Sequence, residues 1–156
     1  MSTAPAAGSP AGPAAPEYVG FWARVAATLL DTVWLLLLLA PLLALVYGAG
    51  YFTLEHLLSG TTDLGETLIG CGLPALLVIA FWRARRATPG KMAIGAQIVD
   101  AQTLGAPTLG QLLIRYLGYF VAAIPLGLGL VWVAFDRRKQ GWHDKLAGTI
   151  VVRVKR

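Results

Sequence analysis

Apolar residues are concentrated in three long runs, at residues 21–47, 64–82 and 109–135, separated by polar or turn-forming segments. Because an α-helix rises 1.5 Å per residue, about 20 apolar residues are needed to cross the hydrocarbon core of a bilayer. The first run exceeds this length and the second approaches it. We therefore expect membrane-spanning helices at residues 22–47 and 64–82.

The third run, residues 109–135, contains helix-interrupting residues at Pro125, Gly127 and Gly129. Two full spans do not fit within it, whereas a single crossing would place the basic C-terminal segment outside, against the positive-inside rule. A helical hairpin with a short second arm satisfies the rule, and so does a re-entrant loop buried against the other helices. We favour the hairpin, which gives about three to four transmembrane helices.

Two shorter segments, residues 94–100 and 149–154, are rich in β-branched side chains and predict strands. A lone strand would leave an unpaired edge, so we expect the two to pair with each other. The predicted fold class is an all-α polytopic membrane protein with a small cytoplasmic two-stranded β element.

The distribution of charge orients these elements. Residues 48–66 contain acidic residues and His56 but no Lys or Arg, whereas Arg83, Arg85 and Arg86 follow the second run. By the positive-inside rule, this basic end faces the cytoplasm. We expect a multi-pass protein of the cell inner membrane with both termini cytoplasmic.

The composition narrows the classes of function. The 13 Lys and Arg residues exceed the 8 Asp and Glu residues, for a net charge of +5, yet most basic residues flank apolar runs. At such positions they set topology and contact anionic lipid, so the bilayer is the expected partner and nucleic acid is not. The single Cys71 forms no intrachain disulfide, and a lone His56 does not indicate a metal site.

The chain divides into two parts. Residues 1–17 are dominated by Ala, Pro and Gly and predict a disordered tail, followed by a membrane domain at residues 18–156. The tail has neither the basic segment nor the apolar segment of a cleavable signal peptide. The first apolar run is therefore expected to act as the uncleaved targeting segment.

Three polar residues of the first span, Arg24, Thr28 and Asp31, share one helical face. Insertion of an Asp or Arg near the centre of a membrane helix costs roughly 2.5–3.5 kcal/mol, so such residues are expected only where they have a structural or functional role. Arg24 can extend to the headgroups, but Asp31 must be protonated, partnered or exposed to a hydrated cavity. Thr28 is placed to bridge them, and Arg115 of the third run is near enough to the cytoplasmic face to reach lipid headgroups or Asp31.

Two further segments carry motifs. The tetrapeptide TPGK at residues 88–91 looks like part of a phosphate-binding loop, but Met92 replaces the Ser or Thr that would hold magnesium. Nucleotide binding and other cofactors are therefore not expected. Residues 136–148 predict a helix at the membrane interface, with Trp142, Leu146 and Ala147 on its apolar side.

Together these motifs resemble the RDD family of bacterial membrane proteins, which is named for one arginine and two aspartates. The resemblance extends over nearly all of the chain after Tyr18. It rests on Arg24, Asp31, the C-terminal sequence FDRRKQGWHDKLAGTIVV and four consecutive residues, Thr88, Pro89, Gly90 and Lys91. The second aspartate matches either Asp136 or Asp144, and Arg137 stands where the family usually has Pro.

The resemblance implies a role in transport, since some members of the family are linked to sodium/proton exchange. Asp31 would then bind a proton or a small monovalent cation, with Arg24, Arg115 or the Asp144 region tuning its pKa. A chain this small would need to form a homo-oligomer to enclose a path.

The alternative is a non-transporting accessory or interaction protein, in which the same Arg and Asp residues form a buried polar clasp. Catalysis is not expected, because His143 and Asp144 are adjacent and point in different directions on a helix. The two hypotheses share their candidate residues, which are Arg24, Thr28, Asp31, Arg115, Asp136, His143 and Asp144.

Overall fold

The computed structural model describes residues 16–60 and 62–154, so most of the tail predicted at residues 1–17 lies outside the described residues. The α-helices are α1 (Phe21–Tyr47), α2 (Leu54–Ser59), α3 (Leu64–Thr67), α4 (Leu73–Arg85), α5 (Pro89–Ala93), α6 (Leu109–Ala123), α7 (Leu128–Val131) and α8 (Trp142–Ala147). The strands are β1 (Ala96–Asp100) and β2 (Thr149–Arg153).

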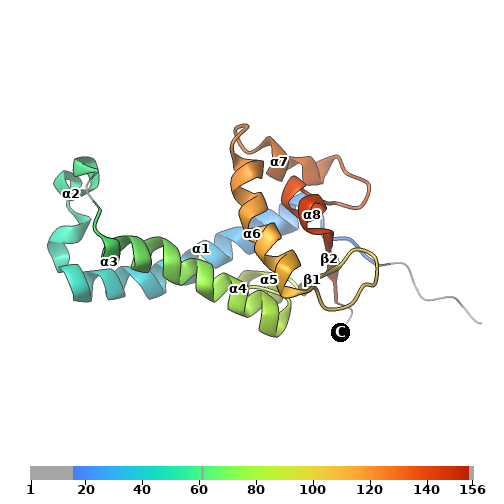
Figure 1. Cartoon of the computed structure of the whole chain (residues 1–156), viewed down its shortest axis with the longest axis horizontal. Helices are drawn as coiled ribbons and strands as arrows, with labels where there is room; N and C mark the ends of the chain where they lie inside the picture. Colours follow the sequence, from blue (N-terminus) through green and yellow to red (C-terminus); the bar gives the residue numbers. More distant parts are fainter. Residues whose placement is uncertain (1–15, 61, 155–156) are drawn as a thin grey trace, which may run out of the picture.

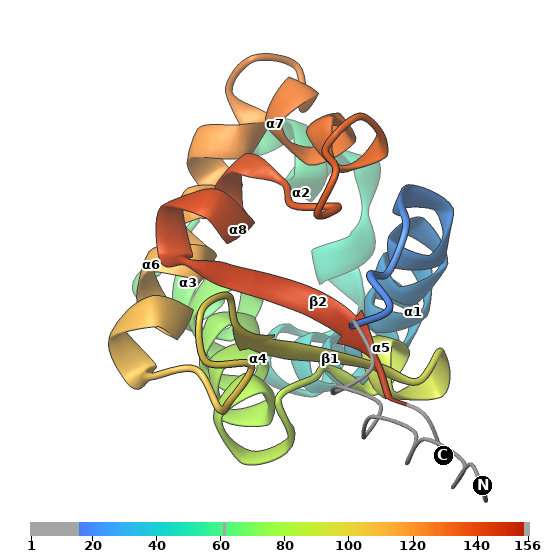
Figure 2. The same ribbon diagram turned by 90° about the vertical axis from the view of Figure 1, so that its right-hand side faces the viewer.

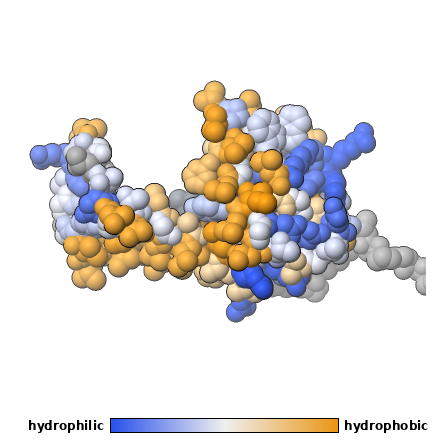
Figure 3. All heavy atoms as spheres, in the orientation of Figure 1, coloured by the Kyte–Doolittle hydropathy of each residue, from blue (hydrophilic) through white to orange (hydrophobic). Residues whose placement is uncertain are grey.

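Helix α1 and the stretch from α3 to α4 lie side by side as a long arm, with α2 at one end and α5 to α8 and the two strands gathered at the other (Figure 1). Phe21–Tyr47 and Leu64–Ala93 are both long and apolar enough to cross a membrane. Almost none of their most apolar windows is buried inside the protein. Figure 3 shows apolar side chains along the arm and over α6 and α7. The prediction of a mostly helical membrane protein is confirmed.

The second span contains a π-helix, Leu68–Gly72, directly before α4. Its position matches the interruption that Gly70, Gly72 and Pro74 suggest, because Pro74 has no N–H to donate to the preceding turn. Neither glycine supports close helix packing within the described chain, since a Cβ on Gly70 would have nothing within 4 Å and one on Gly72 would meet only Leu68, at 3.6 Å.

The third apolar run is broken where the sequence predicts a break. Helix α6 is followed by a turn in which Leu126 and Gly127 have φ of 52° and 76°, and α7 with the 3₁₀ helix Trp132–Ala134 is bent 116° from it. With 15 residues, α6 is too short to span a bilayer alone, and it lies across the arm in Figure 1. The part of the chain that the structure describes thus has two candidate spans, or three if the bent pair forms one, and the two crossings of a hairpin stay a prediction.

The two strands pair antiparallel, from Ala96 opposite Arg153 to Asp100 opposite Thr149, which confirms the predicted pairing. The segment before α1 joins the other edge of β2, where Val19 N donates to Val151 O at 3.0 Å. Viewed along the arm, the strand pair lies between α1 and α6 (Figure 2). The buried core beneath it consists of Val19, Trp82, Ala96, Ile98, Leu112 and Val151.

Helix α8 differs from the interfacial helix predicted at residues 136–148. It has only 6 residues, and its buried side consists of His143, Asp144 and Ala147, whereas Leu146 is 55% exposed. The side packed into the protein is therefore the one that carries Asp144, because its carboxylate finds cationic partners there, and the interfacial position of the helix stays a prediction. On α6, a Cβ added to Gly118 would lie 2.9 Å from the Cα of His143, so α8 packs closely on α6.

Candidate functional site

The carboxylate of Asp144 is the centre of a buried cluster that joins α1, α6 and α8. Arg24 of α1 donates from Nη1 to its Oδ2 at 2.5 Å, and Arg115 of α6 donates from Nη1 to its Oδ1. The backbone N–H of Gly141 donates to Oδ2 at 3.1 Å. Asp144 and Arg115 are completely buried. We call Arg24, Arg115 and Asp144 the arginine–aspartate clasp.

The clasp also reaches the strand pair. Arg115 Nη1 donates to Oγ1 of Thr149, the first residue of β2, at 2.8 Å. Its guanidinium lies 5.4 Å from the ring of Trp82 and 5.9 Å from that of Tyr119, within cation–π range. Its Nε and Nη2 have no hydrogen-bond partner among the described residues. Arg115 therefore connects α6 to β2 while keeping unused donor capacity.

Arg24 makes two further hydrogen bonds that fix the start of α1. Its Nη2 donates to the carbonyl oxygen of Lys139 at 2.6 Å, and its Nε donates to that of Val19 at 3.1 Å. The side chain is only 11% exposed, so it does not extend freely to the headgroups. Arg24 thus joins the first span to the segment before α8.

Electrostatics keep Asp144 ionised. Burial alone would raise the pKa of this carboxyl group, but Arg115 and Arg24 beside it outweigh burial and hold the pKa well below its usual range. The clasp is therefore two cations sharing one anion.

His143 lies next to the clasp and is buried. Its ring stacks on that of Tyr119, with centroids 4.0 Å apart and planes 17° apart. Burial lowers the pKa of His143 to about 3, and Asp144, whose Oδ2 lies 3.6 Å from Nε2, offsets this only in part. The ring is neutral at pH 7, and its Nδ1 has no hydrogen-bond partner among the described residues.

The low pKa of His143 predicts acid sensitivity. The imidazole of the unfolded chain takes up a proton below about pH 6.5, whereas the folded protein does not until about pH 3, so stability falls as the pH drops between these values. Thermal unfolding measured in detergent from pH 8 to pH 4 should show this loss. His143→Gln should flatten the profile, and His56→Gln, which removes the partly exposed histidine of α2 and keeps His143, is the control. An unaltered pH profile in His143→Gln would contradict the attribution of the acid sensitivity to His143.

Asp31 is the centre of a second cluster, which joins α1 to α5. Its Oδ2 accepts from Thr88 Oγ1 at 2.5 Å, and its Oδ1 accepts from the backbone N–H of Gly90 at 2.7 Å and from Trp34 Nε1 at 3.0 Å. The ammonium of Lys91 lies 3.9 Å from Oδ2. We call Asp31 and its partners on α5 the Asp31 clamp.

The observed contacts of Thr28 and Arg115 contradict three expectations drawn from the sequence. Thr28 does not bridge Arg24 and Asp31, because its hydroxyl donates to the carbonyl oxygen of Arg24 one turn earlier, at 2.9 Å. Arg115 meets Asp144 and neither reaches solvent nor pairs with Asp31. The helical face shared by Arg24 and Asp31 therefore serves two separate clusters.

The sequence left the two aspartates of the C-terminal segment equivalent, and the structure separates them. Asp136 pairs with Lys145, whose side chain is 44% exposed, and accepts from the backbone N–H of Arg138 at 3.0 Å. Only Asp144 reaches Arg24. Sequence reasoning also missed Trp34 and Tyr119, although each lies one helical turn after a recognised charge, at i+3 from Asp31 and i+4 from Arg115.

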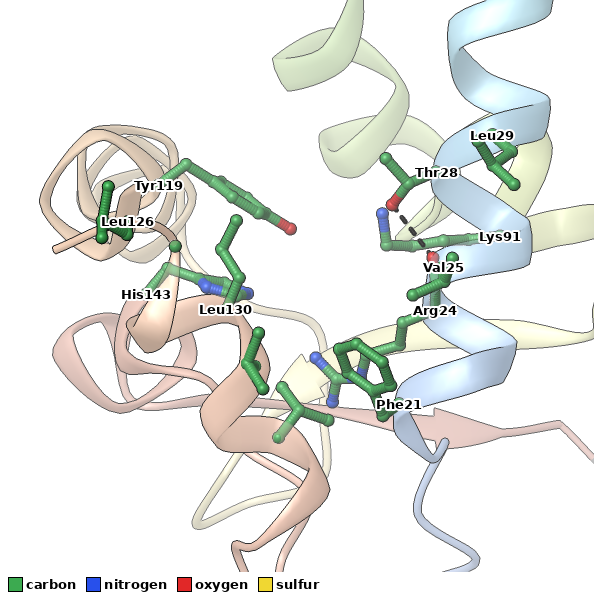
Figure 4. Close-up of a pocket in the computed structure, with 13 residues that line it drawn as sticks. Phe21, Arg24, Val25, Thr28, Leu29, Lys91, Tyr119, Leu126, Leu130 and His143 are labelled. Atoms are coloured by element: carbon green, nitrogen blue, oxygen red, sulfur yellow. Dashed lines mark hydrogen bonds between the residues drawn. The ribbon is translucent and has the colours of Figure 1, made fainter. Parts of the chain in front are cut away.

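Two cavities open beside these clusters. The larger, of about 420 Å³, lies between α1 and the α6–α7 pair, and Figure 4 shows Tyr119 and Lys91 approaching it from opposite sides. The smaller, of about 240 Å³, is lined by Asp31 and Thr88. Thr28, Lys91 and Tyr119 line both. Within residues 16–60 and 62–154, no group of three or more His, Cys, Asp or Glu side chains is arranged to hold a metal ion.

The protein has apolar helices that are long enough to cross a bilayer, and buried Arg–Asp pairs join them to a small strand pair. These features define a class of small helical membrane proteins. The chain belongs to the RDD family, whose sequence model matches residues 18–148. This confirms the resemblance drawn from the motifs.

One curated relative is an uncharacterised protein of Rickettsia prowazekii (strain Madrid E), 41% identical over 75 residues. The alignment covers 48% of this chain and 41% of that protein, so the matched part is less than half of the relative's length. No solved structure matches the chain.

Proposed function

We propose that this protein is a non-transporting accessory or interaction protein of the cell inner membrane, in which the clasp and the clamp hold the membrane helices to the strand pair. One observation carries the proposal: both oxygens of Asp31 accept hydrogen bonds from donors of the protein itself. A carboxylate so occupied is suited to a structural role.

Cation/proton exchange makes the opposite demand on a carboxylate. Its oxygens must bind a proton or a cation in turn, so free acceptor capacity must remain on the carboxylate. Asp31 already accepts three hydrogen bonds on its roughly four lone-pair sites, and Asp144 is paired with two arginines, so little capacity remains at either carboxylate. The buried charges are explained without any transported substrate.

The remaining parts of the proposal concern topology and partners. The basic residues Arg83, Arg85 and Arg86 end α4 beside the strand pair, which supports a cytoplasmic location for that pair and for both termini. The exposed apolar surface of the arm supports contact with lipid and, we propose, with further copies of the chain. We propose no catalytic role for the protein.

Cation/proton exchange remains the second candidate, because one observation favours it. The side chain of Asp31 is 14% exposed and lines the smaller cavity together with Thr28, Lys91 and Tyr119. A carboxylate at the wall of a cavity is where a cation path would place its carrier.

Proton flux into liposomes distinguishes the two functions. Protein reconstituted with a trapped pH dye would be pulsed with sodium, lithium or potassium, beside Asp31→Asn, Asp31→Glu and the loop control Glu55→Gln. We expect no cation-dependent flux from any of them, and a loss of stability of roughly 1–3 kcal/mol in Asp31→Asn. A tight clamp should also tolerate Asp31→Glu poorly. Flux that disappears in a folded Asp31→Asn protein would establish exchange instead.

A further inference from the structure

The larger cavity combines apolar walls with a cationic end. Its polar lining comes from Arg24, Thr28, Lys91, Tyr119 and His143. Its apolar lining comes from α1 and from the α6–α7 region, namely Phe21, Val25, Leu29, Leu126, Leu130, Val131 and Val133. Its volume of about 420 Å³ lies within the range of sites that hold small molecules.

Lys91 is the least satisfied cation at this end. Its side chain is 9% exposed, and its ammonium, which has three N–H donors, makes one hydrogen bond to the described residues, of 3.4 Å to Thr88 Oγ1. Its distance of 3.9 Å from Asp31 is long for an ion pair, and Asp31 is already held by shorter bonds. A buried ammonium with free donors is costly unless an anion approaches it.

The charges of the two clusters do not balance. Arg24, Arg115 and Lys91 contribute three positive charges, and Asp31 and Asp144 contribute two negative charges, which leaves one positive charge. The side chains of both clusters are at most 14% exposed, so solvent compensates this charge only in part. A single anionic group at Lys91 would restore neutrality.

We propose that the cavity binds one anionic lipid, with the phosphate of its headgroup at Lys91 and an acyl chain along the wall formed by Leu29, Leu126 and Leu130. In Figure 4 the hydroxyl of Tyr119 points from α6 toward α1, across the same space. It gives the phosphate a neutral donor, and Arg24 adds charge at the rim.

The walls identify a lipid rather than a small soluble anion. The exposed fractions of Leu29 and Leu126 are 62% and 98%, so the cavity wall continues into the apolar surface of α1 and of the α6–α7 turn. That surface is continuous with the apolar surface of the arm (Figure 3), whose helices are long and apolar enough to cross a bilayer. A lipid can therefore enter sideways from the membrane with its chain remaining in an apolar environment throughout.

Lipid binding by the delipidated full-length protein in detergent tests the proposal. Native mass spectrometry and thermal unfolding would compare phosphatidylglycerol, phosphatidylcholine with identical acyl chains, and glycerol 3-phosphate. We expect one phosphatidylglycerol per chain, bound at least tenfold more tightly than phosphatidylcholine, and no stabilisation by glycerol 3-phosphate. Equal binding of the two lipids would overturn the proposal that the site selects an anionic headgroup. Stabilisation by glycerol 3-phosphate alone would overturn the proposal that the ligand is a lipid.

Two variants locate the site. Lys91→Gln should lower the affinity for phosphatidylglycerol about tenfold and remove the preference over phosphatidylcholine, whereas Arg137→Gln, at an exposed cation, should do neither. Leu130→Trp should fill the cavity and reduce lipid occupancy, whereas Leu128→Trp, outside it, should not. If Lys91→Gln does not fold, unchanged occupancy in Leu130→Trp overturns the proposal. The lipid site does not depend on the proposed clasp function, which the flux measurement tests separately.

Discussion

Replacement of Asp144 by Asn is expected to destabilise the protein by about 3–5 kcal/mol, the largest loss from any single charge among the described residues. The amide would leave Arg24 and Arg115 without the anion that they share, and Arg115 has no exposed surface through which water could compensate. The damage should spread beyond α8, because Arg115 also holds Thr149 of β2. Unfolding in detergent, followed by near-ultraviolet circular dichroism, measures this loss.

Asp136→Asn is the matched control for this variant. It removes the same charge eight positions earlier, from a carboxylate whose partner Lys145 is 44% exposed. Asp136 itself is 13% exposed, but water reaches the pair through Lys145, and solvent-exposed pairs contribute only about 0–1 kcal/mol, so this variant should lose clearly less stability than Asp144→Asn. Equal losses of stability in Asp144→Asn and Asp136→Asn would show that the buried clasp contributes no more to stability than the partly exposed pair.

Replacement of Gly90 by Ala is expected to separate α5 from α1. An added Cβ would overlap the carbonyl oxygen of Ala27 and lie 2.9 Å from the carboxylate carbon of Asp31. Both neighbours belong to α1, and the carbonyl oxygen is backbone, so the two helices must move apart. The shift would break the hydrogen bond from Gly90 N to Asp31, and overpacking of this kind costs about 1–3 kcal/mol before that loss is added.

Gly70→Ala provides the comparison. Gly70 also lies in a helical segment, but a Cβ there would have nothing within 4 Å, so its replacement should leave stability unchanged or slightly increased. Crosslinking of cysteines introduced at Thr28 and Lys91, in a Cys71→Ser background, can follow the separation of α1 and α5 directly in the membrane. Two variants of equal stability would contradict the close approach of α5 to α1.

Together the two clusters explain how a chain with few buried apolar residues in its arm keeps one arrangement. Almost no residue in the windows that define the spans is fully buried within the protein, so apolar packing between the spans contributes less than a closed core would. The clasp fixes α1 to α6, α8 and β2, and the clamp fixes α1 to α5, which leads into β1. The first span is thereby tied to both strands of the sheet through buried polar contacts.

The sequence by itself determined the features that depend on local composition. The length of the apolar runs fixes the candidate spans, the turn residues around Gly127 fix the break in the third run, and β-branched residues fix the two strands. The motifs were sufficient to identify the RDD family. Each of these features is set by neighbouring residues and needs no knowledge of distant contacts.

Only the tertiary structure decided which charges meet. On one helix, Arg24 and Asp31 look like partners, and Asp136 and Asp144 look equivalent in the C-terminal segment. In the fold, Arg24 contacts Asp144, 120 positions away, and Asp31 contacts Gly90, 59 positions away. Hydrogen bonds require donor and acceptor within about 3 Å, and spacing along a chain does not determine distances between elements. The partners of each buried charge therefore depend on how α5, α6 and α8 pack around the first span.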